Sequence, residues 1–287
     1  MGHAMTERLT ARGRHFAESP FHVWGIVNVT PDSFSDGGRF MQLSSALERA
    51  RQLLADGADV LDVGGASSRP GAVFPSEQEE LERVRPVLKS LASGRDGAGR
   101  SAGRFISIDT WRAGVARAAL EAGADIVNDI SACAWDQGLI DVVAQYSPGY
   151  VLTHCPARPD EMVPQACDDI WQELLRFFEN RLAYLVRNGV PEENILLDPG
   201  IGFGKTAEQN WQILRGIGRL RTFGRPVLAG ISRKRFLGAV TGVAPGDRDS
   251  VTAACSALLW ERGVRHHRVH DAARAAEALR AAVLFRD

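Results

Sequence analysis

Short apolar runs alternate along the chain with longer stretches in which apolar residues recur every three or four positions. The clearest of these stretches, residues 168–188, places Trp171, Leu174, Phe178 and Leu182 on one face of a helix. The short runs are rich in Val, Ile and Leu, which is typical of strands that are covered on both faces. The pattern therefore predicts helices that alternate with buried strands.

One phrase recurs three times: an Ala- and Leu-rich helical stretch ends at a glycine, and an apolar strand follows. The glycines are Gly57, Gly123 and Gly263, and each fits a left-handed helix C-cap, where a Cβ is unfavourable. With the remaining apolar runs, the sequence predicts eight strands, at residues 23–29, 60–63, 105–108, 126–128, 150–153, 195–197, 226–230 and 266–269.

Strict alternation of strands and helices implies parallel pairing. Eight such units in 287 residues favour a single-domain α/β protein, a (β/α)8 TIM barrel, over an open doubly wound sheet, which normally uses fewer strands. We expect the barrel to span residues 21–287, and residues 1–20 to be an N-terminal extension that is partly a tag or flexible. Residues 90–103, rich in Gly, Ser and Arg, read as a connector at the N-terminal face.

The charge balance restricts the classes of partner. Lys and Arg number 34 and Asp and Glu 35, so the formal net charge is −1. Without a basic excess, we expect no nucleic-acid partner and no membrane partner. No apolar run approaches the ~20 residues that span a bilayer, and the N-terminus lacks a signal peptide's apolar segment, so we expect a cytoplasmic protein. The four cysteines form no C-x-x-C pair and read as reduced thiols.

In such a barrel, active-site residues lie at the C-terminal ends of the strands. Almost every predicted strand ends there in a polar or ionisable side chain. A helix N-cap accounts for an isolated Asp at such a position, but a ring around one mouth indicates function. The ring consists of Asn28, Asp62, Asp109, Asn128, Asp129, His154, Asp198, Ser232, Arg233, Lys234, Arg268 and His270. Two long polar loops, residues 30–40 and 64–71, suit lids over a ligand.

A glycine-rich segment at residues 198–206 is not a nucleotide-binding P-loop, because Pro199 stands where that motif needs its first glycine. Asp198 reads instead as an acid that faces a ligand. The loops after the seventh and eighth strands are the usual phosphate site of this fold. They carry the basic residues Arg233, Lys234, Arg235, Arg268 and His270. No motif indicates a nucleophilic serine or a catalytic zinc.

Seven segments resemble the dihydropteroate synthase family, pterin-binding enzymes of the bacterial folate pathway. They follow the family's order over nearly the whole chain, and the first and fifth are highly specific. The segments are residues 25–38 (GIVNVTPDSFSDGG), 62–72 (DVGGASSRPGA), 107–110 (SIDT), 128–130 (NDI), 197–206 (LDPGIGFGKT), 232–234 (SRK) and 268–270 (RVH).

The resemblance implies an enzyme that joins (7,8-dihydropterin-6-yl)methyl diphosphate to 4-aminobenzoate and releases 7,8-dihydropteroate and diphosphate. It also implies a (β/α)8 barrel, a Mg²⁺ cofactor, a homodimer and inhibition by sulfonamides, which mimic 4-aminobenzoate. The attacking nucleophile is the aromatic amine of the substrate, which explains why no nucleophilic residue is evident.

The resemblance also implies roles for residues that grip the pterin. Asp198 would accept two hydrogen bonds from the guanidine-like edge of the pterin. Asn128, Asp109 and Lys234 would satisfy its other heteroatoms, since an unpaired buried polar atom costs ~1–3 kcal/mol. Phe203 joins this substrate-binding set.

A second group would act on the leaving diphosphate and on the second substrate. Arg268 and His270, with Mg²⁺ held near Asn28, would stabilise the departing diphosphate. Ser68 and Arg69, in the second mobile loop, would bind substrate and help to exclude water. We expect Asp109, Lys234, Arg268 and His270 to be the catalytic residues.

The sequence departs from the family pattern at several positions. Ala66 replaces a common Glu, Ser68 a Thr, and Arg235 a Ser, while Cys155 and Ala157 replace Met and Gly. These changes bear on substrate affinity and sulfonamide sensitivity. Two alternatives remain: a catalytically weak pterin-binding paralogue, or a methyltetrahydrofolate-type methyltransferase, which would not be expected to keep both the Ser-Arg-Pro loop and Ser-Arg-Lys.

Overall fold

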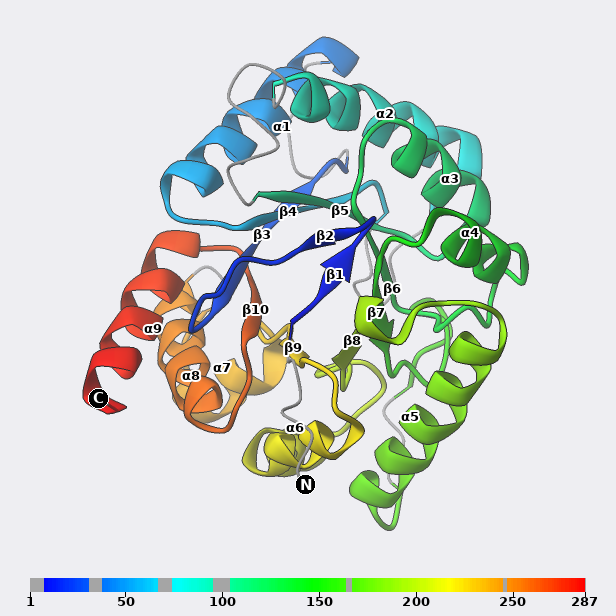
Figure 1. Cartoon of the computed structure of the whole chain (residues 1–287). Helices are drawn as coiled ribbons and strands as arrows, with labels where there is room; N and C mark the ends of the chain where they lie inside the picture. Colours follow the sequence, from blue (N-terminus) through cyan, green and yellow to red (C-terminus); the bar gives the residue numbers. More distant parts are fainter. Residues whose placement is uncertain are drawn as a thin grey trace.

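The computed structural model describes residues 8–30, 38–66, 74–94, 104–163, 167–244 and 247–286. In them, eight parallel strands form a central barrel with helices around it (Figure 1). The strands are β3 (His22–Asn28), β4 (Val60–Gly64), β5 (Phe105–Asp109), β6 (Ile126–Asp129), β7 (Gly149–Thr153), β8 (Ile195–Asp198), β9 (Leu228–Ala229) and β10 (His266–Val269).

The strands are hydrogen-bonded in the order β8-β7-β6-β5-β4-β3-β10-β9. A single parallel bridge, from Leu197 in β8 to Val227 just before β9, joins the two ends of this sheet. The sheet is therefore closed, which confirms the predicted TIM barrel and excludes the open doubly wound sheet. The eight predicted strands match the observed ones to within two residues at each end.

The helices lie outside the barrel (Figure 1). Two of them begin with a capping box. In each, the first residue's side chain accepts the backbone N–H of the residue three positions on, whose own side chain accepts the first residue's backbone N–H. The pairs are Ser76 with Glu79, and Thr206 with Gln209. The helices are α1 (Gly38–Ala55), α2 (Glu77–Ser93), α3 (Ala113–Glu121), α4 (Gly138–Tyr146), α5 (Ile170–Arg187), α6 (Ala207–Gly216), α7 (Arg235–Thr241), α8 (Asp249–Glu261) and α9 (Ala272–Arg286), with 3₁₀ turns at Glu192–Asn194 and Ile217–Phe223.

Side-chain alternation along the strands separates two apolar cores. Successive residues of a strand point to opposite faces of the sheet. In β8, Ile195 and Leu197 belong to the large core between sheet and helices, whereas Leu196 belongs to a smaller cluster. That smaller cluster lies inside the barrel near the N-terminal ends of the strands and includes Trp24 and Val60.

A short antiparallel hairpin, β1 (Thr10–Ala11) and β2 (Arg14–His15), contributes to the inner cluster. Leu9, Ala11 and Phe16 are buried there, and the Phe16 ring stacks on Phe105 with 4.0 Å between ring centroids. The hairpin therefore packs against the N-terminal end of the barrel interior, within the segment expected to be an extension. Residues 1–7 lie outside the described residues.

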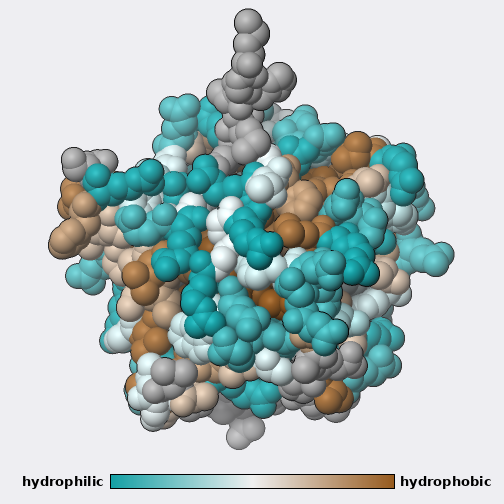
Figure 2. All heavy atoms as spheres, turned by 90° about the horizontal axis from the view of Figure 1, so that it is seen from below, coloured by the Kyte–Doolittle hydropathy of each residue, from teal (hydrophilic) through white to brown (hydrophobic). Residues whose placement is uncertain are grey.

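The surface shown in Figure 2 is mainly polar, with hydrophobic residues in small groups between polar ones. This is typical of helices whose apolar faces pack against a sheet. Among the described residues, none of the helices has the length and hydropathy needed to cross a membrane. Most of the connector expected at residues 90–103 falls outside the described residues.

The hairpin offers a test of its contribution to the inner core. We expect Phe16→Ala to lower the free energy of unfolding by about 3–5 kcal/mol, because it removes a buried ring and leaves a cavity. Val163→Ala is the control, since Val163 is 65% exposed and its truncation should change stability by less than about 0.5 kcal/mol. Urea unfolding followed by circular dichroism measures both. Equal stability of the two variants would contradict the packing role.

Candidate active site

Above the inner apolar cluster, towards the C-terminal ends of the strands, the interior becomes polar. Side chains two and four residues further along the same strands point inward by the same alternation. These residues are Asn28 of β3, Asp62 of β4, Asp109 of β5, Asn128 of β6, Asp198 of β8 and Arg268 of β10. All of them except Asp62 belong to the substrate-binding, metal-binding or catalytic residues that the sequence predicts.

The guanidinium of Arg268 connects three strands in this layer. Its Nε donates to Asp62 Oδ2 at 2.6 Å, and its Nη2 donates to Asp109 Oδ2 at 2.7 Å. Asn128 Nδ2 donates to the same Asp62 oxygen at 3.0 Å. Since Asp62 is completely buried, its charge is compensated by these side chains rather than by solvent.

Burial and this network shift the pKa values of the pair. Burial raises the pKa of Asp109 to about 7, although Arg268 opposes the shift, and the nearby carboxylate of Asp62 adds to it. Burial alone lowers the pKa of Arg268, but Asp62 and Asp109 raise it above the ordinary value. Arg268 thus stays cationic, while Asp109 can take up a proton near neutral pH.

Asp198 ends β8 and is buried beside the cations. Its Oδ1 accepts the backbone N–H of Gly200 at 2.7 Å. Burial raises the pKa of Asp198, and Gly200, Lys234, Lys205 and Arg268 act in the opposite direction. Among the described residues, no hydrogen bond reaches Oδ2, so its lone pairs are available to a ligand, as the interpretation of Asp198 as a pterin-binding acid requires.

Lys234 lies over the ring of Phe203, with 4.2 Å from Nζ to the ring centroid. Its stem is packed so closely against Gly202 that a Cβ there would be 2.9 Å from Lys234 Cδ. Burial lowers the pKa of Lys234 to about 8, although Asp198 opposes this shift. The loop after β8 and the turn after β9 therefore meet at one side of the site.

Lys205 is a buried cation that stabilises this loop. Its Nζ donates to the backbone oxygens of His154 at 3.2 Å, Gly200 at 2.9 Å and Phe203 at 3.2 Å. Burial lowers the pKa of Lys205 to about 8. These contacts tie the loop that follows Asp198 to the end of β7 and fix the place of the Phe203 backbone.

His270 follows β10 at the mouth. Its Nδ1 is 2.8 Å from the Ser232 hydroxyl, and its backbone N–H donates to the same oxygen at 3.0 Å. Arg49 of α1 donates to the His270 carbonyl. The imidazole is held by the Ser-Arg-Lys turn, so the two loops expected to bind phosphate are in contact.

Several residues of the predicted ring lie elsewhere. Asp129 accepts two backbone N–H groups and the Tyr150 hydroxyl on the outer side of the sheet. His154 Nε2 is 3.1 Å from Glu173 Oε1 of α5. Arg233 forms a bidentate ion pair with Asp249 of α8. The expectation that these residues line the mouth is wrong, because β-alternation and outer helices direct them away.

Ser68 and Arg69 lie outside the described residues, as do most of the two predicted loops. Sequence reasoning assigned no role to two residues of the site, Asp62 and Lys205. Asp62 belongs to the predicted ring but received no role there. Its position two residues before the end of β4 was the sequence signal that could have placed it inside the barrel. Lys205 stood in the glycine-rich segment, and no sequence signal indicated that its ammonium turns to three carbonyls.

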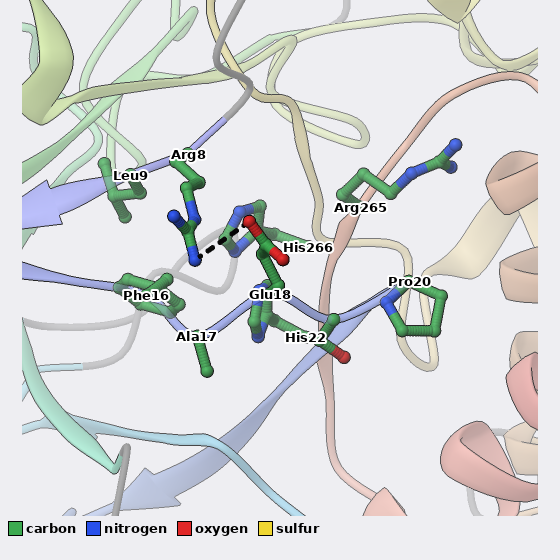
Figure 3. A pocket seen from close by; sticks show the side chains of 10 residues that line it. Arg8, Leu9, Phe16, Ala17, Glu18, Pro20, His22, Arg265 and His266 are labelled. Atoms are coloured by element: carbon green, nitrogen blue, oxygen red, sulfur yellow. Dashed lines mark ion pairs between the residues drawn. The ribbon is translucent and has the colours of Figure 1, made fainter. Parts of the chain in front are cut away.

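A pocket of about 530 Å³ opens at the opposite end of the barrel, beside the hairpin. Figure 3 shows its wall, where Arg8 and Glu18 form an ion pair. His22 and His266, which also line it, come from the N-terminal ends of β3 and β10. None of the candidate site residues lines this pocket.

Comparisons with known proteins agree with this geometry. The family model described as "Pterin binding enzyme" matches residues 24–270. A dihydropteroate synthase of Streptococcus pyogenes is 43% identical over 261 residues, which are 90% of this chain and 93% of the relative. The chain belongs to the dihydropteroate synthase family. Its function is therefore dihydropteroate synthesis, and it is a transferase.

Solved structures of the dihydropteroate synthase family support the same conclusion. The Xanthomonas albilineans enzyme with 4-aminobenzoic acid has a TM-score of 0.89 and 38% identity, covering 98% of both chains. The Yersinia pestis enzyme with a sulfonamide drug complex has a TM-score of 0.88 and 38% identity, covering 97% of this chain and 99% of the other. The predicted family, fold and function are confirmed.

Gly200 allows a test of the loop that positions Asp198. The residue has a φ of +65°, and a Cβ would lie 1.9 Å from the His154 carbonyl oxygen. We expect Gly200→Ala to displace this loop, weaken pterin binding at least tenfold in calorimetry and lower stability by more than the ~1–2 kcal/mol of left-handed strain alone.

Gly13→Ala is the matched control, because Gly13 also has a positive φ, +72°, but a Cβ there meets nothing within 4 Å. This variant should lose only the stability that the left-handed backbone strain costs, and its affinity for pterin should be unchanged. Similar affinities of the two variants would show that the clash at Gly200 does not reach the site.

Proposed function

We propose that this chain joins (7,8-dihydropterin-6-yl)methyl diphosphate to 4-aminobenzoate. The amine nitrogen bonds to the pterin methylene carbon, the C–O bond to diphosphate breaks, and the amine loses a proton. The observation that supports this proposal is the polar layer at the C-terminal mouth of the barrel, in which Asp62 and Asp109 bind Arg268 and Asn128 donates to Asp62.

The acids and amides of this layer suit a flat heterocycle rich in N–H groups. We assign Asp198 to the guanidine-like edge, where a buried carboxylate can accept two hydrogen bonds. Asn128, Asp109 and Lys234 take the remaining ring heteroatoms. The Phe203 ring, which lies under the Lys234 ammonium, keeps its proposed role in binding substrate. Ser68 and Arg69 keep their proposed role in binding substrate.

The cations suit the leaving group. Arg268 uses Nε and Nη2 on the two carboxylates, and we assign Nη1 to the diphosphate. We assign His270, which Ser232 holds at the mouth, to the diphosphate as well. Because the carboxylates fix the guanidinium before substrate arrives, little reorganisation accompanies the build-up of negative charge on the diphosphate.

The predicted Mg²⁺ fits this site as an ion held by one protein ligand together with water and the diphosphate. In the described residues, no group of three His, Cys, Asp or Glu side chains could hold a metal. Mg²⁺ commonly takes one or two protein ligands and completes its shell with water and substrate phosphates. The amide oxygen of Asn28, which is paired in register with Gly64 at the mouth, is such a ligand. Bound there, the ion would neutralise charge on the diphosphate.

The purified chain tests this reaction directly. We expect diphosphate release that depends on both 4-aminobenzoate and Mg²⁺, together with 7,8-dihydropteroate identified by mass spectrometry. Arg268→Ala is expected to lower kcat/KM by about two orders of magnitude or more, because a buried charge stabilising the leaving group is lost. Pterin binding without product would favour the catalytically weak paralogue.

A homodimer is the expected partner state, and the last two helices support it. Leu258 of α8 and Leu284 and Phe285 of α9 are 60%, 77% and 93% exposed, and α8 packs along α9. Exposed apolar groups of this kind mark interaction surfaces. We propose that they bury against a second copy of the chain, and that the enzyme works in the cytoplasm, where its four free cysteines stay reduced.

The charge-introducing variant Leu258→Glu tests this surface. Sedimentation equilibrium is expected to show a dimer for the parent chain and a weaker dimer, by at least about tenfold in Kd, for the variant. Val163→Glu is the control, since Val163 is equally exposed but lies between β7 and α5. A monomeric parent chain would refute the proposal.

A further inference from the structure

Asp62 differs from the buried aspartates Asp125 and Asp129 in what donates to it: no backbone N–H of the described residues does. Asp125 accepts the backbone N–H of Ile106, and Asp129 accepts two backbone N–H groups and the Tyr150 hydroxyl. Both therefore fasten the backbone, which is a common structural role of a buried carboxylate. In the part of the chain that the structure describes, the donors to Asp62 are two side chains, Arg268 and Asn128.

Both donors reach one oxygen of Asp62. Arg268 Nε and Asn128 Nδ2 bond to Oδ2 at 2.6 and 3.0 Å, while Oδ1 is buried without a partner among the described residues. Asp62 is completely buried and Arg268 is largely so. A carboxylate kept there, with half its hydrogen-bonding capacity unused by the protein, is not explained by fold stability alone.

The geometry shows what this carboxylate does to its neighbours. Asp62 holds Nε of Arg268, and Asp109 holds Nη2, so two carboxylates on adjacent strands fix both the position and the plane of the guanidinium. The same Asp62 oxygen fixes the amide of Asn128, so that its Nδ2 faces Asp62 and its Oδ1 faces away. One buried group thereby orients a diphosphate-binding cation and a pterin-binding amide together.

We infer that Asp62 is a positioning residue, which acts on the dihydropterin diphosphate by setting the orientation of Arg268 and Asn128. The inference rests on the proposed roles of these two residues. It predicts that loss of the Asp62 charge weakens the pterin substrate selectively, because the site for 4-aminobenzoate draws on other residues.

Asp62→Asn tests this inference, because the amide keeps the size of the side chain and removes its charge. Either orientation of the amide places N–H groups against Arg268 and Asn128 or leaves them buried without a partner. In calorimetry, we expect the Kd for (7,8-dihydropterin-6-yl)methyl diphosphate to rise about tenfold or more, while the KM for 4-aminobenzoate stays within about twofold. The Kd measurement needs no turnover, so a parent chain that binds the pterin but forms no product refutes the proposed function and leaves the calorimetric comparison of the variants intact.

A double-mutant cycle separates positioning from a general structural defect. If Asp62 acts through Arg268, Asp62→Asn should weaken binding far less in the Arg268→Lys background than in the parent chain. Asp125→Asn is the matched control: it removes the charge of another buried aspartate, at the other end of the barrel, and should lower stability without changing the Kd for the pterin.

Should Asp62→Asn fail to fold, Asp62→Glu gives the same measurement, since it keeps the charge but displaces it by one methylene. We again expect weaker pterin binding with an unchanged KM for 4-aminobenzoate. Three results would overturn the inference: an unchanged Kd in the folded variant, a parallel loss for both substrates, or losses from Asp62→Asn and Arg268→Lys that simply multiply.

Discussion

The site depends on one largely buried cation, Arg268, held between the completely buried carboxylate of Asp62 and the largely buried carboxylate of Asp109. Arg268 is separated from Asp109 by 159 residues and from Asp62 by 206. Its strand, β10, pairs with β3 and β9, so Arg268 reaches the acids of β4 and β5 across the interior of the curved sheet. Because a charge in a dry interior is costly unless it is paired, the register of three strands must be correct before these charges are compensated. Fold and chemistry are coupled at this point, because the same ion pairs that depend on the correct register also orient the cation.

Much of this architecture is legible in the sequence because its causes are local. A strand's length and its Val and Ile content depend only on neighbouring residues. The same holds for the helix ends at Gly57, Gly123 and Gly263, and all three glycines have the expected positive φ. The strand ends follow directly, so Asp109, Asn128, Asp198, Lys234 and Arg268 could be named as one group. The hairpin at residues 10–15 was missed because strands of two residues carry no period, and its stability comes from contacts with the barrel interior.

What the sequence could not supply is the pairing of charges across the barrel. Asp109 and Arg268 were assigned to opposite ends of the substrate, yet they bond to each other, and Asp62 bonds to Arg268 as well. Likewise nothing in the segment around Lys205 indicates that its ammonium bonds to three carbonyls rather than facing a ligand. The contacts of Arg268 join residues 159 and 206 positions apart, and those of Lys205 depend on how its loop folds back on itself and on β7; neither leaves a periodic trace in the sequence.

Neighbouring strands of the barrel are joined by different numbers of paired residues, and this affects where the barrel can open. Seven of the eight seams are ladders of paired residues, whereas β8 and β9 meet at one bridge, Leu197 to Val227. Local opening begins where the fewest backbone hydrogen bonds must break, so amide protons near this seam should exchange with solvent soonest. Asp198 and Lys234 stand on its two sides. A heterocycle that contacts both residues would link the two sides of this seam. Its binding would therefore slow local opening, and with it amide exchange, at the part of the barrel that otherwise opens most readily.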